Sequence, residues 1–280
     1  MRRFGPLLLL LAALPLTAAQ DPPKEDPGKA QVASTSDLDV VLGLYKIAHG
    51  GKARFDGLRT MAFRYAPSVF DEKGNELRSA EWDVSILFRP DLDEQEQRVV
   101  RMEGSYALSD GSEPARVVGL VTGSDVQVWY EGADGELVST DAQRIKNTVA
   151  FHATALLNQL DLVYWTDSKD IRCRFGGVLK RDGKDFATLE AEYSPSRSVP
   201  EPARLYFSGV TSLIERVDAF DPKLHMRIGT VYLEGYKDHD GIKFPSLLRQ
   251  VDRRMRPIGN WYLSDVVLDG EYEADHWSKP

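Results

Sequence analysis

The sequence predicts a mainly β protein of the α+β type, in which one long antiparallel sheet of roughly ten to twelve strands wraps around helices. Apolar and polar residues alternate over many short stretches, which is typical of strands with one face on a core. Apolar residues recur at helical spacing in only two places, near 37–49 and 141–165. Turn-forming residues separate the strand-like stretches at Lys73-Gly74-Asn75, Asp110-Gly111, Asp134-Gly135, Asp182-Gly183 and Asp240-Gly241.

Residues 1–19 have the three parts of a secretory signal peptide in the expected order. Arg2 and Arg3 form the positive region, residues 7–16 form a short apolar region, and small residues 17–19 precede Gln20. An apolar stretch of roughly ten residues is too short to span a bilayer as a helix. We therefore expect cleavage close to Ala19 and a mature protein in the periplasm or outside the cell. An uncleaved N-terminal anchor is the alternative.

A flexible linker and a helix are expected next. Residues 20–36 are polar and rich in proline, as linkers are. Ser36 and Asp39 have the spacing of a capping box, and Gly50-Gly51 is typical of a helix end. Apolar residues between these signals follow helical spacing: Leu38, Val41, Leu42, Tyr45 and Ala48. Residues 37–280 are expected to form one β domain.

Two strands and the second helix supply the candidate binding residues. Side chains two residues apart share one face of a strand, and a helix with a broad apolar stripe must pack on something apolar. Thr140 and Gln143 have the spacing of a second capping box at the start of that helix. We expect the sheet and this helix to line an apolar pocket with Trp82, Val84, Ile86, Phe88, Met102, Tyr106, Leu156, Leu157 and Leu160.

Composition limits the classes of partner. The 35 Lys and Arg against 43 Asp and Glu give a net charge of −8, which argues against a nucleic-acid partner. No stretch after the signal peptide is apolar enough for a membrane span. Cys173 is the only cysteine, so the domain has no disulfide, and we expect a buried, inert thiol on a strand. Its two arginine neighbours leave a reactive thiol as the alternative.

Motifs for catalysis, metals and cofactors are missing. The sequence contains no Gly-x-Ser-x-Gly, no His-Glu-x-x-His and no glycine-rich phosphate loop. Asp238-His239-Asp240 precedes Gly241, so we interpret it as a hairpin turn, with a metal site as the alternative. His152 is interpreted as a packed histidine on a helix face and not as a base. No catalytic residue, metal or cofactor is predicted.

The acidic run Asp91, Asp93, Glu94 and Glu96 follows Pro90 at the end of an apolar strand. A solvated loop is the expected structure, and a weak calcium site is the alternative.

Three stretches carry a resemblance to a known family. They are Tyr45–Gly51, which ends in Ala-His-Gly-Gly; Leu205–Phe207 with Leu213–Val217; and Tyr236–Pro245, followed by a last strand near 258–268. Together they resemble the LolA/LolB-like superfamily of exported bacterial proteins, in particular its uncharacterised relatives of the outer membrane lipoprotein-sorting type. The resemblance covers roughly residues 37–270.

The resemblance implies a curved antiparallel half-barrel with helices covering its concave face, and an apolar cavity that shields lipid or lipoprotein acyl chains. It implies a non-catalytic carrier or sensor with an acyl chain as ligand and an envelope protein as further partner. Two alternatives remain from the residues. One is an envelope module for protein interaction or structure whose core is filled by its own side chains. The other is an exported hydrolase with a cleft of acids and histidines.

Overall fold

The computed structural model describes residues 35–51, 53–54, 57–78, 80–88, 98–106, 115–132, 134–164, 171–193 and 202–278. The predicted signal peptide, the linker up to residue 34, the acidic run at 91–96 and the turn at Asp110-Gly111 lie outside these residues.

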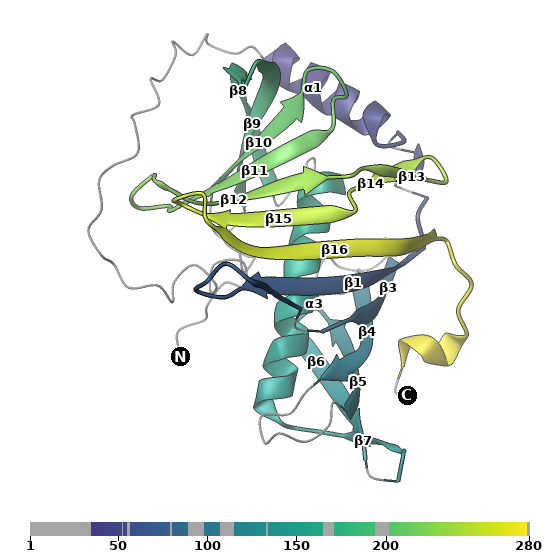
Figure 1. Cartoon of the computed structure of the whole chain (residues 1–280). Helices are drawn as coiled ribbons and strands as arrows, with labels where there is room; N and C mark the ends of the chain where they lie inside the picture. Colours follow the sequence, from purple (N-terminus) through teal and green to yellow (C-terminus); the bar gives the residue numbers. More distant parts are fainter. Residues whose placement is uncertain are drawn as a thin grey trace.

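One antiparallel sheet of 14 strands dominates the structure (Figure 1). Its order is β7-β6-β5-β4-β3-β1-β16-β15-β12-β11-β10-β9-β8, and β2 pairs beside β1. The strands of its first half are β1 (Thr60–Phe70), β2 (Glu76–Arg78), β3 (Trp82–Phe88), β4 (Arg98–Tyr106), β5 (Ala115–Thr122), β6 (Asp125–Glu131) and β7 (Leu137–Ser139). The strands of its second half are β8 (Ile171–Arg181), β9 (Lys184–Tyr193), β10 (Ala203–Ser208), β11 (Ile214–Phe220), β12 (Arg227–Glu234), β15 (Leu247–Asp252) and β16 (Pro257–Leu268). A separate hairpin contains β13 (Lys237–His239) and β14 (Ile242–Phe244).

The described residues hold sixteen strands, against the ten to twelve predicted. The difference comes from β2, β7, β13 and β14, which have three residues each. Three residues are too few to show an alternating pattern, so the sequence reveals only the longer strands.

The path of the chain through the sheet is simple. From β1 in the middle, the strands step outward to β7 at one edge. Helix α3 (Gln143–Tyr164) then leads to β8 at the other edge, and the later strands step back until β16 pairs with β1. The first and last long strands are therefore neighbours, with Met61 opposite Leu268.

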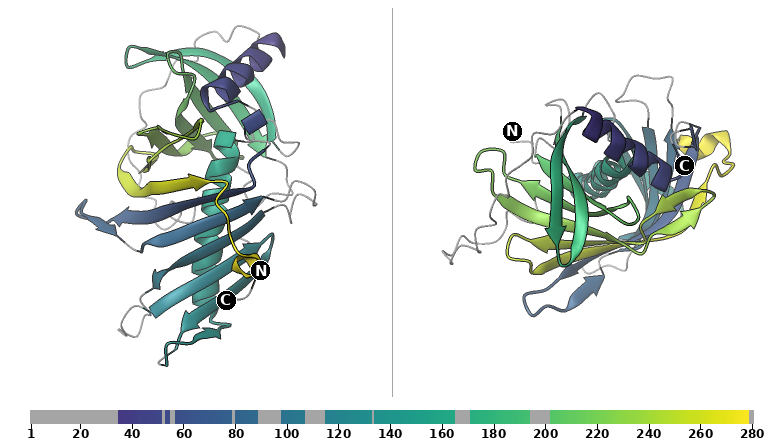
Figure 2. Two further views of the ribbon diagram at one scale, coloured as in Figure 1. Left: turned by 90° about the vertical axis from the view of Figure 1, so that its right-hand side faces the viewer. Right: turned by 90° about the horizontal axis from the view of Figure 1, so that it is seen from above.

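The sheet is strongly curved and open. Figure 2 shows it bending around α3, which lies on the concave side, while α1 (Thr35–Ala48) crosses one end. Among the described strands, β7 and β8 end the sheet and do not pair with each other. The predicted mainly β class, the single large antiparallel sheet and its cover of helices are confirmed.

Four of the five predicted turns lie within the described residues, and all four connect strands. Gly74, Gly135, Gly183 and Gly241 have φ between 77° and 85°, the left-handed conformation that glycine adopts without a steric cost. At Asp240-Gly241 both residues have positive φ, and the Gly241 N–H donates to Asp238 Oδ1 at 2.8 Å. Asp238-His239-Asp240 thus belongs to a tight hairpin, as predicted.

Helix α1 begins at Thr35, so its first two residues overlap the end of the predicted linker. Tyr45 on its inner face is buried in the core. The helix ends at Ala48, and Gly50 and Gly51 follow it with φ of 114° and 85°, so the predicted glycine stop is confirmed. A Cβ on Gly50 would lie 2.1 Å from the carbonyl oxygen of Gly241, so only glycine allows this approach to the β13–β14 hairpin.

Helix α3 begins differently from the prediction. The Ala142 N–H donates to Thr140 Oγ1 at 3.0 Å, and the helix starts after it, at Gln143. The Gln143 side chain donates forward to Asn147 Oδ1 at 2.7 Å. The predicted capping box, in which the glutamine reaches back to residue 140, is wrong because the helix starts too late for that pairing.

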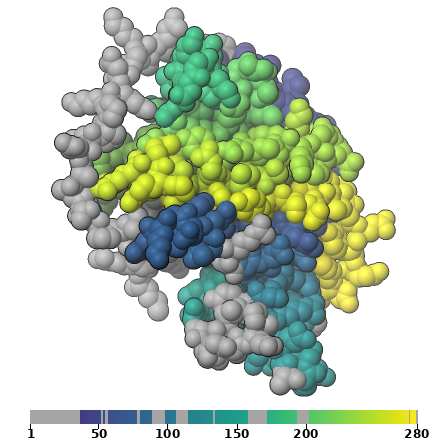
Figure 3. Space-filling model, viewed as in Figure 1, coloured from purple at the N-terminus to yellow at the C-terminus, as the bar shows by residue number. Residues whose placement is uncertain are grey.

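The C-terminal segment packs on the convex face of the sheet. In Figure 3, which shows this face, the yellow C-terminal residues lie against the blue strands of the first half. The short 3-10 helix η1 (Ala274–Trp277) places Trp277 on a small apolar cluster that contains Val99, Val118, Leu120 and Trp129. The sheet thus has apolar contacts on both faces in this half.

Candidate functional site

The predicted binding residues of β3 and β4 lie on the concave face. Trp82, Val84 and Ile86 alternate with residues of the convex face, and their relative exposure is 2% or less. Register places Val84 opposite Met102 of β4, which is also fully buried. The alternation seen in the sequence therefore indicated the correct face of both strands.

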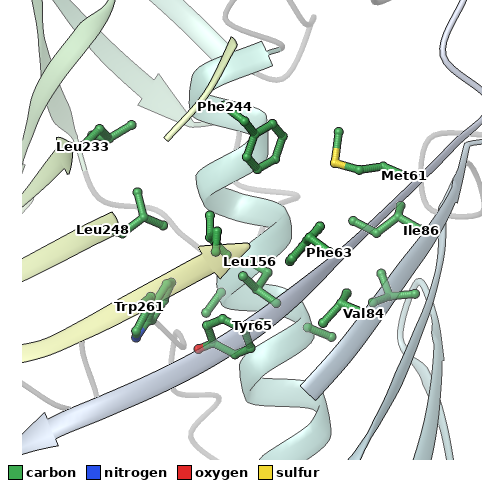
Figure 4. Close-up of a cluster of buried hydrophobic side chains, with 14 of the residues drawn as sticks. Met61, Phe63, Tyr65, Val84, Ile86, Leu156, Leu233, Phe244, Leu248 and Trp261 are labelled. Carbon is green, nitrogen blue, oxygen red and sulfur yellow. The ribbon is translucent and has the colours of Figure 1, made fainter. Parts of the chain in front are cut away.

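Helix α3 covers this face. Its buried residues Val149, Ala153 and Leu156 belong to the same cluster as the β3 residues, and Leu157 packs against that cluster while partly exposed. The close-up in Figure 4 shows Leu156 of α3 facing Phe63, Tyr65 and Val84 of the sheet. Contact between helix and sheet is thus mainly apolar.

Seven of the nine predicted site residues meet in this one cluster. Phe88 packs at its margin together with Leu157. The side chains of Tyr106 and Leu160 lie outside the described residues, although their backbones belong to β4 and α3.

The sequence reasoning missed the central strands. Met61, Phe63 and Tyr65 of β1 and Trp261 of β16 are buried in the same cluster, and Figure 4 shows them beside α3. The signal was available, because Met61, Phe63 and Tyr65 alternate with Ala62 and Arg64 in the sequence.

A polar contact lies within the apolar cluster. The Tyr65 hydroxyl lies 3.1 Å from His152 Nδ1, and thereby joins β1 to α3. Burial lowers the pKa of His152 from 6.5 to about 4 and raises that of Tyr65 well above its usual value, so both are neutral near pH 7. As predicted, His152 is a packed histidine on a helix face.

A pocket of about 190 Å³ lies on the convex face, between the sheet and the C-terminal segment. His276 Nε2 lies 2.8 Å from Ser85 Oγ, and Arg101 donates to the carbonyl oxygen of His276 at 3.0 Å. Arg101 also forms an ion pair with Glu103 at 2.6 Å. These contacts hold the C-terminal segment, and sequence reasoning missed them because Ser85 and His276 are 191 residues apart.

Cys173 and the potential metal-ligating side chains are weaker candidates for a functional site. Cys173 lies on β8, the predicted strand, but is partly exposed and not fully buried. In the part of the chain that the structure describes, no three His, Cys, Asp or Glu side chains gather as metal ligands would. Within the same residues, no helix has the length and apolar character needed to cross a membrane.

The chain is similar to known proteins in its structure but not in its sequence. No family model matches the sequence, and no curated protein matches it. A DUF1329-family protein from Desulfovibrio piger has a TM-score of 0.54 at 14% identity, with 85% of this chain and 97% of that chain covered. A LolA-superfamily protein from Nitrosomonas europaea has a TM-score of 0.51 at 11% identity, with 86% and 97% covered. This is the LolA fold.

A third solved structure agrees. An outer membrane lipoprotein-sorting protein domain from Vibrio parahaemolyticus has a TM-score of 0.50 at 10% identity, with 85% of this chain and 95% of that chain covered. At such identities the likeness concerns the fold alone. The LolA fold confirms the resemblance that the three sequence stretches indicated.

Proposed function

We propose that this chain is an exported, periplasmic, non-catalytic binding protein, and that the concave face of its sheet holds lipid or lipoprotein acyl chains. One observation carries the proposal: a large, continuous apolar face is covered by α3 and, at one end, by α1, through mainly apolar contacts. The LolA fold supports it, since one solved structure of this fold carries the name of an outer membrane lipoprotein-sorting protein domain.

Binding on this face follows from the hydrophobic effect. When α3 moves from the sheet, an acyl chain can replace its apolar contacts with contacts of the same kind. Each methylene group that leaves water contributes about 0.8 kcal/mol. No bond is made or broken, so the residues only have to present apolar surface. The proposed wall consists of the predicted residues Trp82, Val84, Ile86, Phe88, Met102, Tyr106, Leu156, Leu157 and Leu160.

The second candidate is an envelope module for protein interaction or structure. The observation in its favour is that Trp82, Ile86 and Met102 are buried by the protein's own side chains. In that case α3 is a permanent part of the core and the concave face takes no ligand.

A bulky substitution separates the two functions. If α3 yields to a ligand, Val84→Trp leaves the free energy of unfolding nearly unchanged and weakens binding of a fluorescent fatty-acid probe. If the core is permanently filled, the same change destabilises the fold by about 1–3 kcal/mol through overpacking. Urea denaturation and probe titration measure the two effects.

Val118→Trp is the matched control. Val118 is equally buried but lies in the convex cluster, so overpacking there should destabilise the fold without a direct effect on the concave face. Native mass spectrometry of protein purified from a bacterial host should show copurified lipid. If wild type binds no apolar probe, carries no lipid and loses its fold with Val84→Trp, the module is the correct function.

A further inference from the structure

Trp82 leaves a hydrogen-bond donor unused in the core. Its relative exposure is 1%, and its indole Nε1 has no hydrogen-bond acceptor among the residues that the structure describes. A buried donor without an acceptor costs about 1–3 kcal/mol, so native proteins usually supply a partner. The ring is fixed in place, because a Cβ on Gly104 of the neighbouring strand would lie 2.8 Å from it.

His152 of α3 provides a second donor nearby. Its ring centroid lies 6.3 Å from that of Trp82. Tyr65 is fully buried, and among the described residues its hydroxyl has one hydrogen-bond partner, His152 Nδ1. If Nδ1 accepts this hydrogen bond, the neutral imidazole carries its own hydrogen on Nε2. No described residue accepts from that Nε2–H.

We propose that Trp82 Nε1–H and His152 Nε2–H together bind the carbonyl oxygen of an acyl ester or amide, and so fix the head of the acyl chain on the concave face. This inference rests on the proposed function and names the chemical class of ligand: a chain with a neutral carbonyl group, as in a lipid or an acylated protein.

The position of the two donors fits this role. Trp82 belongs to the sheet and His152 to α3, so they lie on the two surfaces that have to separate to admit a chain. His152 is partly exposed, so a ligand can reach its ring from outside, and the buried ring of Trp82 is its neighbour. The rest of the surrounding cluster is apolar, which suits the hydrocarbon part of the ligand.

A matched pair of ligands tests the inference: methyl laurate, and an alkane of the same chain length that lacks the carbonyl group. Wild type should bind the ester about tenfold more tightly than the alkane, as expected for hydrogen bonds formed in a buried site. Trp82→Phe should bring the ratio of the ester and alkane affinities close to one, and this ratio is the readout because Trp82 also belongs to the proposed wall. Trp261→Phe, which shortens another tryptophan of the same cluster, should keep the preference.

Two substitutions of His152 separate its two nitrogens. His152→Gln keeps a donor near the position of Nε2, whereas His152→Asn keeps a polar group only near Nδ1, beside Tyr65. The glutamine variant should retain the preference for the ester and the asparagine variant should lose it.

The outcomes distinguish this inference from the proposed function. If wild type binds ester and alkane equally, or Trp82→Phe keeps the preference, acyl binding stands but a water or another group satisfies the donors, and the inference fails. If wild type binds neither ligand, the proposed function fails and the inference fails with it.

Discussion

At the scale of single residues, two histidines couple the fold to pH: His49, which is buried, and His152, which is partly exposed. His49 directly follows α1, its ring centroid lies 4.3 Å from that of Tyr45, and its Nδ1 lies 3.1 Å from the Tyr45 carbonyl oxygen. Burial lowers its pKa to about 4, as it does for His152 on α3. Each helix is therefore anchored to the core through an imidazole that has to remain neutral.

The fold should lose stability as pH falls from about 6.5 towards 4. In this range both histidines gain protons in the unfolded chain but resist them in the folded one, so acid favours unfolding. The free energy of unfolding has its full value above pH 6.5. Each of the two histidines lowers it by up to about 3 kcal/mol as the pH falls to 4. Urea denaturation at several pH values measures this slope, and His152→Gln should reduce it. A free energy of unfolding that stays constant from pH 7 to pH 5 would contradict the prediction.

The sequence predicted individual residues well where the signal was local. Alternation placed Trp82, Val84 and Ile86 on the buried face because side chains on a strand have a strict period of two. The contact of Ser85 with His276 could not be predicted, because it depends on how the C-terminal segment folds back over the sheet.

At the scale of elements, α3 packs directly against a glycine of the sheet. A Cβ on Gly119 of β5 would lie 2.4 Å from Val149 Cγ1, which is closer than carbon atoms can pack. The helix can therefore settle on the sheet at this depth only because residue 119 has no side chain.

Gly119→Ala should destabilise the fold by about 1–3 kcal/mol, because the new methyl group pushes α3 outward. Val149→Ala, which removes the methyl groups that would clash, should cost less in the alanine background than in wild type. Thermal or urea unfolding of the four proteins gives the coupling between the two sites. Purely additive effects would show that α3 does not rest on Gly119.

Helices and hairpins with a local sequence signal could be predicted, whereas the pairing of strands that are distant in the sequence could not. Both helices and the hairpins at Asp182-Gly183 and Asp240-Gly241 follow from periodicity and turn chemistry. The start of α3 was misplaced because Thr140 accepts from Ala142 and not from a later helical residue. The pairing of β1 with β16 could not be read from a local sequence pattern, since the two strands lie at opposite ends of the domain's sequence.

At the scale of the whole molecule, the sheet has a protected middle and two exposed edges. β1 and β16 each lie between paired strands, whereas the described structure gives β7 and β8 a partner on one side only. Backbone groups at an edge open to solvent more easily than those in the middle.

Amide hydrogen exchange should follow this order. Peptides that cover β1 and β16 should exchange slowest, and those from β7 and β8 should exchange first, because opening the middle requires breaking ladders on both sides. Mass spectrometry of peptides after deuterium labelling measures the order. Exchange in β1 as fast as in β7 would mean that the middle of the sheet is not its most stable part.

The meeting of the first and last long strands also governs the order of events during synthesis. Ribosomes make the chain from its N-terminus, so Thr60–Phe70 exists long before its neighbour Pro257–Leu268. Each half of the sheet can form from local hairpins. Joining the two halves through β1 and β16 means closing a loop of almost the whole domain, which is slow. The predicted signal peptide would thus precede a chain that stays incompletely folded, and available for threading through a channel, until its last strand has emerged.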